Sequence, residues 1–244
     1  MVAYRIGCAG WVLPKPHQPS FPAEGTHLQR YAGRFPAVEI NSSFYRLHST
    51  ATYERWAASV PADFRFAVKV PRAITHDQRL VATDVLLDVF LSGAMALGDK
   101  VGCLLVQLPP SLAYDAPTVK SFLSDVRARY DGAVALEPRH VSWFTADVDK
   151  RLRMHRVARV AADPAPVPAA AEPAGWPGVV YFRLHGSPRV YYSAYDEPYL
   201  DRLAERLCNA ATRAREVWCI FDNTALGAAV PNALGLLARL SSHR

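Results

Sequence analysis

The segment 134–144 (VALEPRHVSWF) places an acid, a guanidinium and an imidazole within four positions, directly after a short apolar run. Glu137 can transfer a proton, Arg139 can hold an anion through paired N–H donors, and the ring of His140 titrates near neutral pH. A stable fold does not require such a set, because buried charges cost free energy unless they are paired. The segment therefore suggests general acid/base chemistry on an anionic substrate.

Eight short apolar runs must position these side chains. Each run has the length of a strand, and several are apolar at both odd and even positions, which is typical of strands buried on both faces of a parallel sheet. The runs lie at 4–9, 37–41, 65–70, 101–107, 133–138, 157–162, 179–186 and 217–223.

Helical patterns with apolar residues three and four positions apart separate most of these runs. They lie at 26–35, 52–59, 84–97, 117–130, 146–155, 198–215 and 231–240. This α/β alternation predicts a single TIM-barrel domain over residues 1–244, a (β/α)8 barrel with eight parallel strands. The proline-rich segment 163–177 (DPAPVPAAAEPAGWP) cannot form a helix of normal length, so the sixth β-α connection is expected to be irregular.

Polar residues end most of the predicted strands, at the face where such barrels carry their active sites. Because side chains alternate along a strand, Glu39 shares a face with Asn41, and Arg183 shares one with His185. A structural interpretation stays open, in which Lys69 forms an ion pair with Glu39. The strand-end residues are Glu39, Asn41, Lys69, Gln107, Glu137, Arg139, His140, Asp163, Arg183, His185, Asp222 and Asn223.

Their chemistry divides these and nearby residues into two groups. The predicted catalytic acids and bases are Glu137, His140, His185, Glu39 and Asp222. The predicted substrate-binding residues are Lys69, Arg139, Arg183, Asn41, Gln107, Asn223, Tyr45, Trp11, Trp143 and His76. For the aromatic residues the alternative is a place in the core, and for the loop histidine a solvated position.

Several functions fit this set. A phosphodiesterase-type hydrolase would hold phosphate on the cations, and a divalent metal could be bound by some of Glu39, Glu137, Asp163, His185 and Asp222, although no metal-ligand spacing selects among them. A glycoside hydrolase would pair two carboxylates, but neighbouring cations would lower their pKa values. A Schiff-base lyase through Lys69 would need a neutral amine, which neighbouring acids disfavour. The last alternative is a non-catalytic module that binds an anion or nucleic acid.

The composition limits the kinds of partner that the protein is expected to bind. The net charge of +6 and the isoelectric point of about 9.2 favour a small anionic ligand or nucleic acid, although the charges are spread along the chain. No apolar run approaches the roughly 18–20 residues that cross a bilayer, and the first residues do not resemble a secretion signal. Together with four cysteines that form no CxxC pair, this predicts a cytoplasmic protein.

Seven segments in order also resemble one known family. GCAGW, VEINSSFYRL, FAVKVPRAITH, LLVQLPPS, ALEPRHVSW, YFRLHG and FDNTALGAAVPNA are similar to the YecE-like family, domain of unknown function 72. The resemblance covers nearly the whole chain and implies a TIM barrel, but no activity. Its motifs contain most of the strand-end residues, whereas Asp163 lies outside them.

Overall fold

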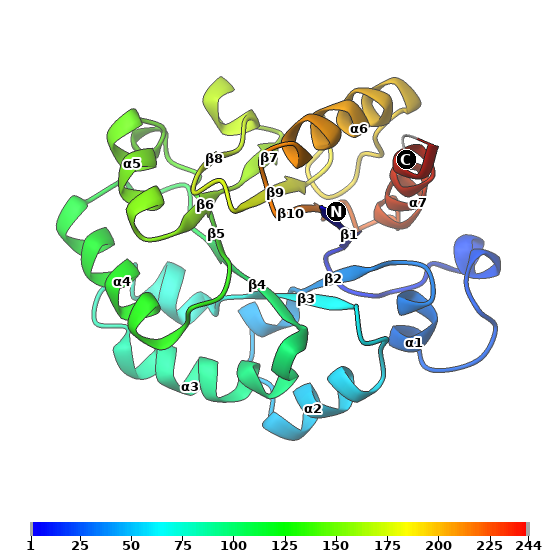
Figure 1. The fold of residues 1–244 in the computed structure, drawn as a ribbon, viewed down its shortest axis with the longest axis horizontal. Coiled ribbons are helices and arrows are strands. Elements are labelled where there is room, and N and C mark those ends of the chain that lie inside the picture. The colour runs from blue at the N-terminus through cyan, green and yellow to red at the C-terminus, as the bar shows by residue number, and fades with distance from the viewer. Residues whose placement is uncertain (1, 243–244) are drawn as a thin grey trace.

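The computed structural model describes residues 2–242, in which strands occupy the middle and helices the outside (Figure 1). The strands are β1 (Ala3–Cys8), β2 (Ala37–Ile40), β3 (Arg65–Lys69), β4 (Val101–Gln107), β5 (Val134–Glu137), β6 (Val157–Arg159), β7 (Ala161–Asp163), β8 (Ala174–Gly175), β9 (Val179–Leu184) and β10 (Glu216–Phe221). The α-helices are α1 (His27–Ala32), α2 (Thr50–Ala58), α3 (Asp84–Ala94), α4 (Ala116–Arg129), α5 (Ala146–Met154), α6 (Glu197–Ala211) and α7 (Ala229–Ser242). Within residues 2–242, no helix combines the length and apolar character needed to cross a bilayer.

The strands form two sheets of a mixed α/β fold. One sheet has the order β1-β10-β9-β7 and the other β2-β3-β4-β5-β6-β8. The pairing is parallel throughout except between β6 and the two-residue strand β8. Helices follow the strands as the alternating sequence pattern predicts, and the parallel pairing confirms that part of the prediction.

The two sheets meet at two places. At one, Ala9 forms a parallel bridge with Glu39, whose carbonyl oxygen accepts the N–H of Gly10 at 2.9 Å. At the other, β6 and β7 continue along one extended segment, which is the run predicted at 157–162. Val160 lies between them and donates its N–H to Leu136 of one sheet, while the next residue pairs with the other sheet.

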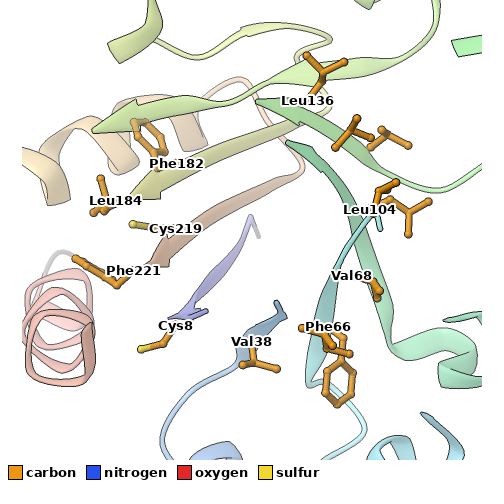
Figure 2. Packing of buried hydrophobic residues seen from close by; sticks show 14 of the residues in the cluster. Cys8, Val38, Phe66, Val68, Leu104, Leu136, Phe182, Leu184, Cys219 and Phe221 are labelled. Atoms are coloured by element: carbon orange, nitrogen blue, oxygen red, sulfur yellow. The ribbon is translucent and has the colours of Figure 1, made fainter. Parts of the chain in front are cut away.

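Alternation along the strands creates two apolar clusters. The larger one packs between the strands and the helices and includes the strand residues labelled in Figure 2. The smaller one faces the opposite way from the same strands and consists of Ala37, Ala67, Cys103, Leu105, Ala135, Val160, Val179, Tyr181, Trp218 and Ile220. In this inner cluster the rings of Tyr181 and Trp218 stack, with 5.9 Å between their centroids. The strands are therefore buried on both faces, as their continuous apolar runs predict.

The sixth connection is irregular, as its prolines predict. After β7 the chain forms a short 3₁₀ helix (Pro168–Ala171) and then β8, which runs antiparallel to β6. The other predicted helices are present, although their bounds shift by a few residues. The predicted helix at 84–97 ends at Ala94, where the chain tightens into a 3₁₀ helix (Met95–Lys100).

Candidate active site at the carboxyl ends of the strands

A layer of polar side chains covers the inner apolar cluster at the carboxyl ends of the strands. Each member lies two residues beyond an apolar member of the cluster, so both point the same way. Glu39 follows Ala37, for example, and Arg183 follows Tyr181. The same relation places Lys69, Gln107, Glu137 and Asp222 in this layer.

Arg183 is the centre of the layer and contacts three carboxylates. Its Nε and Nη2 donate to the two oxygens of Glu39 at 3.0 and 2.7 Å. Its Nη1 lies 3.2 Å from Glu137, and Nη2 lies 3.0 Å from Asp222. The hydroxyl of Tyr181 also donates to Glu39, at 3.0 Å. Burying a guanidinium among three acids is stable only with such complete pairing.

His185 bridges two of these carboxylates. Its Nε2 lies 2.8 Å from Glu137, and its Nδ1 lies 3.0 Å from Asp222. Burial favours the neutral ring, but the charge of Glu137 and the hydrogen bonds to both acids outweigh it and raise the pKa of His185. Both ring nitrogens lie against carboxylates, so these surroundings favour the imidazolium over the neutral ring and do not suit the ring to remove a proton from a substrate.

Glu137 is equally constrained. One oxygen accepts from His185 and from Arg139, the latter at 3.2 Å, and the other accepts from Arg183 and from Gln107, the latter at 3.1 Å. Burial alone would raise the pKa of this carboxyl, yet its cationic neighbours, His185 and Arg183 first, hold it well below its ordinary value.

The pKa of Asp222 is also lowered, because Arg183 and His185 outweigh the effect of burial. Carboxyl groups with lowered pKa values are poor general acids near neutral pH. The acid role predicted for Glu137 therefore does not fit its surroundings.

Lys69 has a different environment from the other charged members of the layer. Its Nζ donates to Asn41 Oδ1 at 3.0 Å and lies 4.2 Å from the centroid of the Phe44 ring. Among residues 2–242 it forms no ion pair with a carboxylate, so the pair with Glu39 considered from the sequence does not form. Burial, reinforced by the charge of Arg183, lowers the pKa of Lys69 to about 8.

His76 shares the Phe44 ring with Lys69. Its ring meets Phe44 edge-on, with centroids 4.9 Å apart, and its Nδ1 lies 2.9 Å from the hydroxyl of Thr75. Burial and the nearby charges of Arg72 and Lys69 lower the pKa of His76. The imidazole is therefore neutral near pH 7 and able to accept a proton.

Two predicted site residues retain polar atoms without partners: Arg139, which lies beside Glu137, and Asn223, which follows Phe221 of the larger cluster and so lies outside the layer. Arg139 donates through Nη1 to Glu137, whereas its Nε is buried and has no hydrogen-bond partner. Asn223 donates to Ser193 and to Asn232, whereas its Oδ1 is likewise buried and without a partner. Buried polar atoms are nearly always satisfied, and these two belong to a group of six side-chain atoms among residues 2–242 that are not.

Several predicted residues lie apart from this layer. Trp143 is fully buried and donates its indole N–H to Leu112 at 2.9 Å, so it belongs to the core and not to the mouth of the site. His140 bonds Ser142 at 2.8 Å and caps the short helix that follows it, so its Nδ1 is engaged within its own loop. Trp11 packs edge-on against Trp56.

Two more predicted residues lie near the layer without a side-chain hydrogen bond to it, although the backbone N–H of His185 donates to the carbonyl oxygen of Asp163 at 2.7 Å. The carboxylate of Asp163 accepts from Tyr195 at 2.8 Å. Tyr45 is 74% exposed and lies against Phe44, with ring centroids 5.0 Å apart, so it is free to contact a ligand at the rim.

Tyr191 is a residue of the site that the sequence analysis missed. Its ring meets His185 edge-on at 6.0 Å, and burial together with the charge of Asp222 raises the pKa of its phenol. Its φ of +70° is unfavourable for any residue but glycine, and such strain often occurs at functional sites. Nothing in the sequence of this loop indicates that conformation.

The donor groups considered for a metal do not assemble into a metal site. Glu39, Glu137 and Asp222 are all bonded to Arg183, and Asp163 lies with Tyr195. In the part of the chain that the structure describes, no three His, Cys, Asp or Glu side chains are grouped as metal ligands. A cation would have to displace a guanidinium already held by these acids.

Comparison with known proteins identifies relatives of this chain. A family model described as "Protein of unknown function DUF72" matches residues 5–244. The UPF0759 protein YecE of Escherichia coli K12 is 31% identical over 165 residues, which is 65% of this chain and 60% of YecE. The UPF0759 protein YunF of Bacillus subtilis 168 is 30% identical over 146 residues, 57% of this chain and 52% of YunF. The matches thus span less than two thirds of these relatives.

Two solved structures share the fold. A DUF72 family protein from Enterococcus faecalis V583 superposes with a TM-score of 0.82 at 22% identity and covers 98% of this chain and 95% of its own. Another DUF72 family protein, from Thermotoga maritima MSB8, superposes with a TM-score of 0.79 at 24% identity. The match covers 98% of this chain and 99% of the other. At such low identities the two structures show that the fold is shared. They do not show a shared function, because one fold can carry many functions.

Proposed function

The chain belongs to the DUF72 family, which has no known function, and we propose that it is an enzyme that binds a small anionic substrate at the carboxyl ends of its strands. The observation that carries this proposal is the buried Nε of Arg139, which lacks a partner at the edge of a fixed polar layer. A guanidinium recognises carboxylate or phosphate through paired donors. Here one of its nitrogens is used by Glu137 and others are available for a ligand.

We propose further that the strands form one closed (β/α)8 barrel, a single domain over residues 1–244. The bridge between Ala9 and Glu39 supports closure on one side, and the continuation of β6 into β7 supports it on the other. Gly7 adds to this, because a Cβ there would collide with the carbonyl oxygen of Ala37. A barrel directs all strand ends to one face, and the proposed site needs that geometry.

Within this proposal the layer has two parts with different tasks. Arg183, Glu39, Glu137, Asp222 and His185 form a floor whose side chains are held in place by ion pairs, and Arg139 adds a further cation beside Glu137. Such a floor positions other groups and exerts a constant field, because preorganised charges need no rearrangement during a reaction. Three side chains lie around this floor: Arg139 has unused donors, and Lys69 and His76 have lowered pKa values. We assign substrate binding and proton transfer to these three residues.

Two predicted alternatives receive less support. A glycoside hydrolase needs one carboxyl that is protonated near neutral pH, whereas the pKa values of Glu137 and Asp222 are both lowered. A metal-assisted hydrolase needs free ligands, and the carboxylates of the floor are already bonded to Arg183. The proposed reaction therefore contains no metal-dependent step. Nucleic acid and a cytoplasmic location remain predictions from charge and composition.

Calorimetric titration with small anions tests binding. The protein is titrated with phosphate, glyoxylate and glycolaldehyde phosphate, and with glycolaldehyde as the uncharged control. We expect the anions to bind and the uncharged compound not to bind. Arg139→Gln should weaken binding by about tenfold or more, since a charge-assisted hydrogen bond is lost.

The matched control is Arg129→Gln, which alters a half-buried arginine paired with Asp88 on the outer helices and should leave the affinity unchanged. Equal affinity of both variants would contradict the assignment of Arg139. Binding without turnover of any substrate in an activity panel would instead favour a non-catalytic binding module.

A further inference from the structure

Lys69 differs from every other lysine of the chain. The sequence contains five lysines, and Lys15, Lys120 and Lys150 are exposed. Lys100 is half-buried and donates to two backbone carbonyls, as a structural lysine would. Lys69 is 5% exposed, and its hydrogen bond goes to the neutral amide of Asn41.

The absence of a carboxylate partner has a structural cause. Arg183 binds all three acids of the floor, so within residues 2–242 none is left to form an ion pair with Lys69. The guanidinium also repels an ammonium ion. An amine in these surroundings loses its proton more easily than an exposed one, because burial and a nearby like charge both disfavour the charged form. Because the pKa is lowered to about 8, the neutral amine is more accessible near neutral pH at Lys69 than in an ordinary lysine.

We propose that Lys69 is a nucleophile that forms an imine with the carbonyl group of a small anionic aldehyde or ketone. This inference rests on the proposed function, in that Arg139 would hold the carboxylate or phosphate of the same molecule. A lysine that is desolvated and lies near another cation is the arrangement that activates an amine for this chemistry.

The proposed step balances with groups already present. The lone pair of Nζ forms a bond to the carbonyl carbon, and the carbonyl oxygen takes up a proton while the nitrogen loses one. The carbon–oxygen bond then breaks, and the oxygen leaves as water with the second proton from nitrogen. The products are the imine and one water molecule. No oxidant or reductant is required.

His76 is suited to move these protons. It contacts the same ring, Phe44, as Lys69, and it is neutral near pH 7 because its pKa is lowered. Its Nδ1 is fixed against Thr75, which orients the imidazole. The ring can accept the proton that nitrogen loses and return it to the departing oxygen. An imine also withdraws electrons from the adjacent carbon, so lyase chemistry beside the carbonyl becomes accessible.

Reductive trapping tests the proposal directly. The full chain is incubated at pH 8 with glyoxylate, with glycolaldehyde phosphate or with propanal, and sodium borohydride is added to convert any imine to a stable secondary amine. Peptide mass spectrometry then locates the label. We expect Lys69 to be labelled about tenfold or more faster than Lys120, since far more of its amine is unprotonated at this pH.

Two variants control the experiment. Lys69→Arg keeps a cation but cannot form an imine, and it should abolish the dominant label. Lys120→Arg alters an exposed lysine and should not change it. Equal labelling of the exposed lysines, or no label on Lys69 with any of the three carbonyl compounds, would overturn the proposal.

The three probes separate this inference from the proposed function. If Arg139→Gln slows labelling by glyoxylate or glycolaldehyde phosphate but not by propanal, both proposals hold, and the faster anion identifies carboxylate or phosphate as the recognised group. If Lys69 is labelled selectively but no faster by the anions than by propanal, the lysine assignment stands and anion binding fails. If calorimetry shows anion binding but Lys69 is not labelled, the lysine assignment alone fails.

Discussion

Arg183 and Lys69 lie in one polar layer but differ in their partners. The guanidinium of Arg183 contacts the carboxylates of Glu39, Glu137 and Asp222, whereas the amine of Lys69 donates to the amide oxygen of Asn41. The pairing of the first residue explains the isolation of the second. Arg183 is thus paired with three carboxylates, whereas Lys69 has no carboxylate partner among residues 2–242.

Replacing Arg183 should strongly destabilise the fold. Arg183→Met would leave three buried carboxylates without their shared counter-charge, and breaking a buried ion pair in this way costs about 3–5 kcal/mol. Urea denaturation at pH 7 measures the change. Arg156→Met, which removes a surface pair with Asp131, should cost less than about 1 kcal/mol. A similar small loss in both variants would contradict the role assigned to Arg183.

Replacing Lys69 should stabilise the fold, which is the opposite of the effect expected for Arg183. Its folded pKa of about 8 lies below the ordinary value of 10.5, so at neutral pH burying the charged amine costs free energy. Lys69→Met should therefore stabilise the protein by about 1–3 kcal/mol at pH 7, and the gain should shrink as the pH rises towards 10. Lys120→Met should change the free energy of unfolding by less than about 0.5 kcal/mol. A net loss of stability in Lys69→Met would show that the lysine is structural.

The carboxylates of the floor should make the protein sensitive to acid. The folded pKa of Glu137 is lowered, so its contribution to stability is present above the unfolded value of about 4.3 and is lost as the pH falls towards the folded pKa. We expect the free energy of unfolding to decrease below about pH 4.5. Glu137→Gln should flatten this dependence, whereas Glu172→Gln, at an exposed pair, should not. Parallel profiles for the wild type and Glu137→Gln would contradict the prediction.

His185 should make the stability of the protein depend on pH in a second, higher range. Its folded pKa is raised, so the stability it contributes is fully present below the unfolded value of about 6.5 and is lost as the pH rises through the folded pKa. Urea unfolding from pH 6 to 9 should therefore show a decline that His185→Gln lacks. Titration of the ring by NMR should give a midpoint above 6.5. A midpoint below that value would mean that the ring is neutral between its two carboxylates.

Alternation and strand order made much of the site predictable from sequence. Residues two positions apart in a strand share a face, so the grouping of Glu39, Glu137, Arg183, Asp222 and Gln107 followed once parallel strands were assumed. The structure does bring these side chains together. Sequence could not reveal which charges neutralise one another, because that depends on distances between different strands.

The less successful predictions concern residues in loops. Loop backbone conformation has no periodicity, so nothing indicated that His140 caps a short helix or that Tyr191 turns towards His185, whereas a place in the core was the stated alternative for Trp143. Lys69 shows a second limit of prediction from sequence, which concerns the charge state of a side chain. Neighbouring acids were expected to keep it protonated, but those acids are taken up by Arg183, and burial then lowers the pKa of the lysine instead.

A crystal structure of the protein with bound phosphate would show directly whether Arg139 holds an anion. We expect electron density for the anion within hydrogen-bonding distance of Arg139 Nε, above an unchanged floor in which Arg183 still contacts Glu39, Glu137 and Asp222. Density for the anion only at other places, with Arg139 Nε still without a partner, would contradict the proposed site.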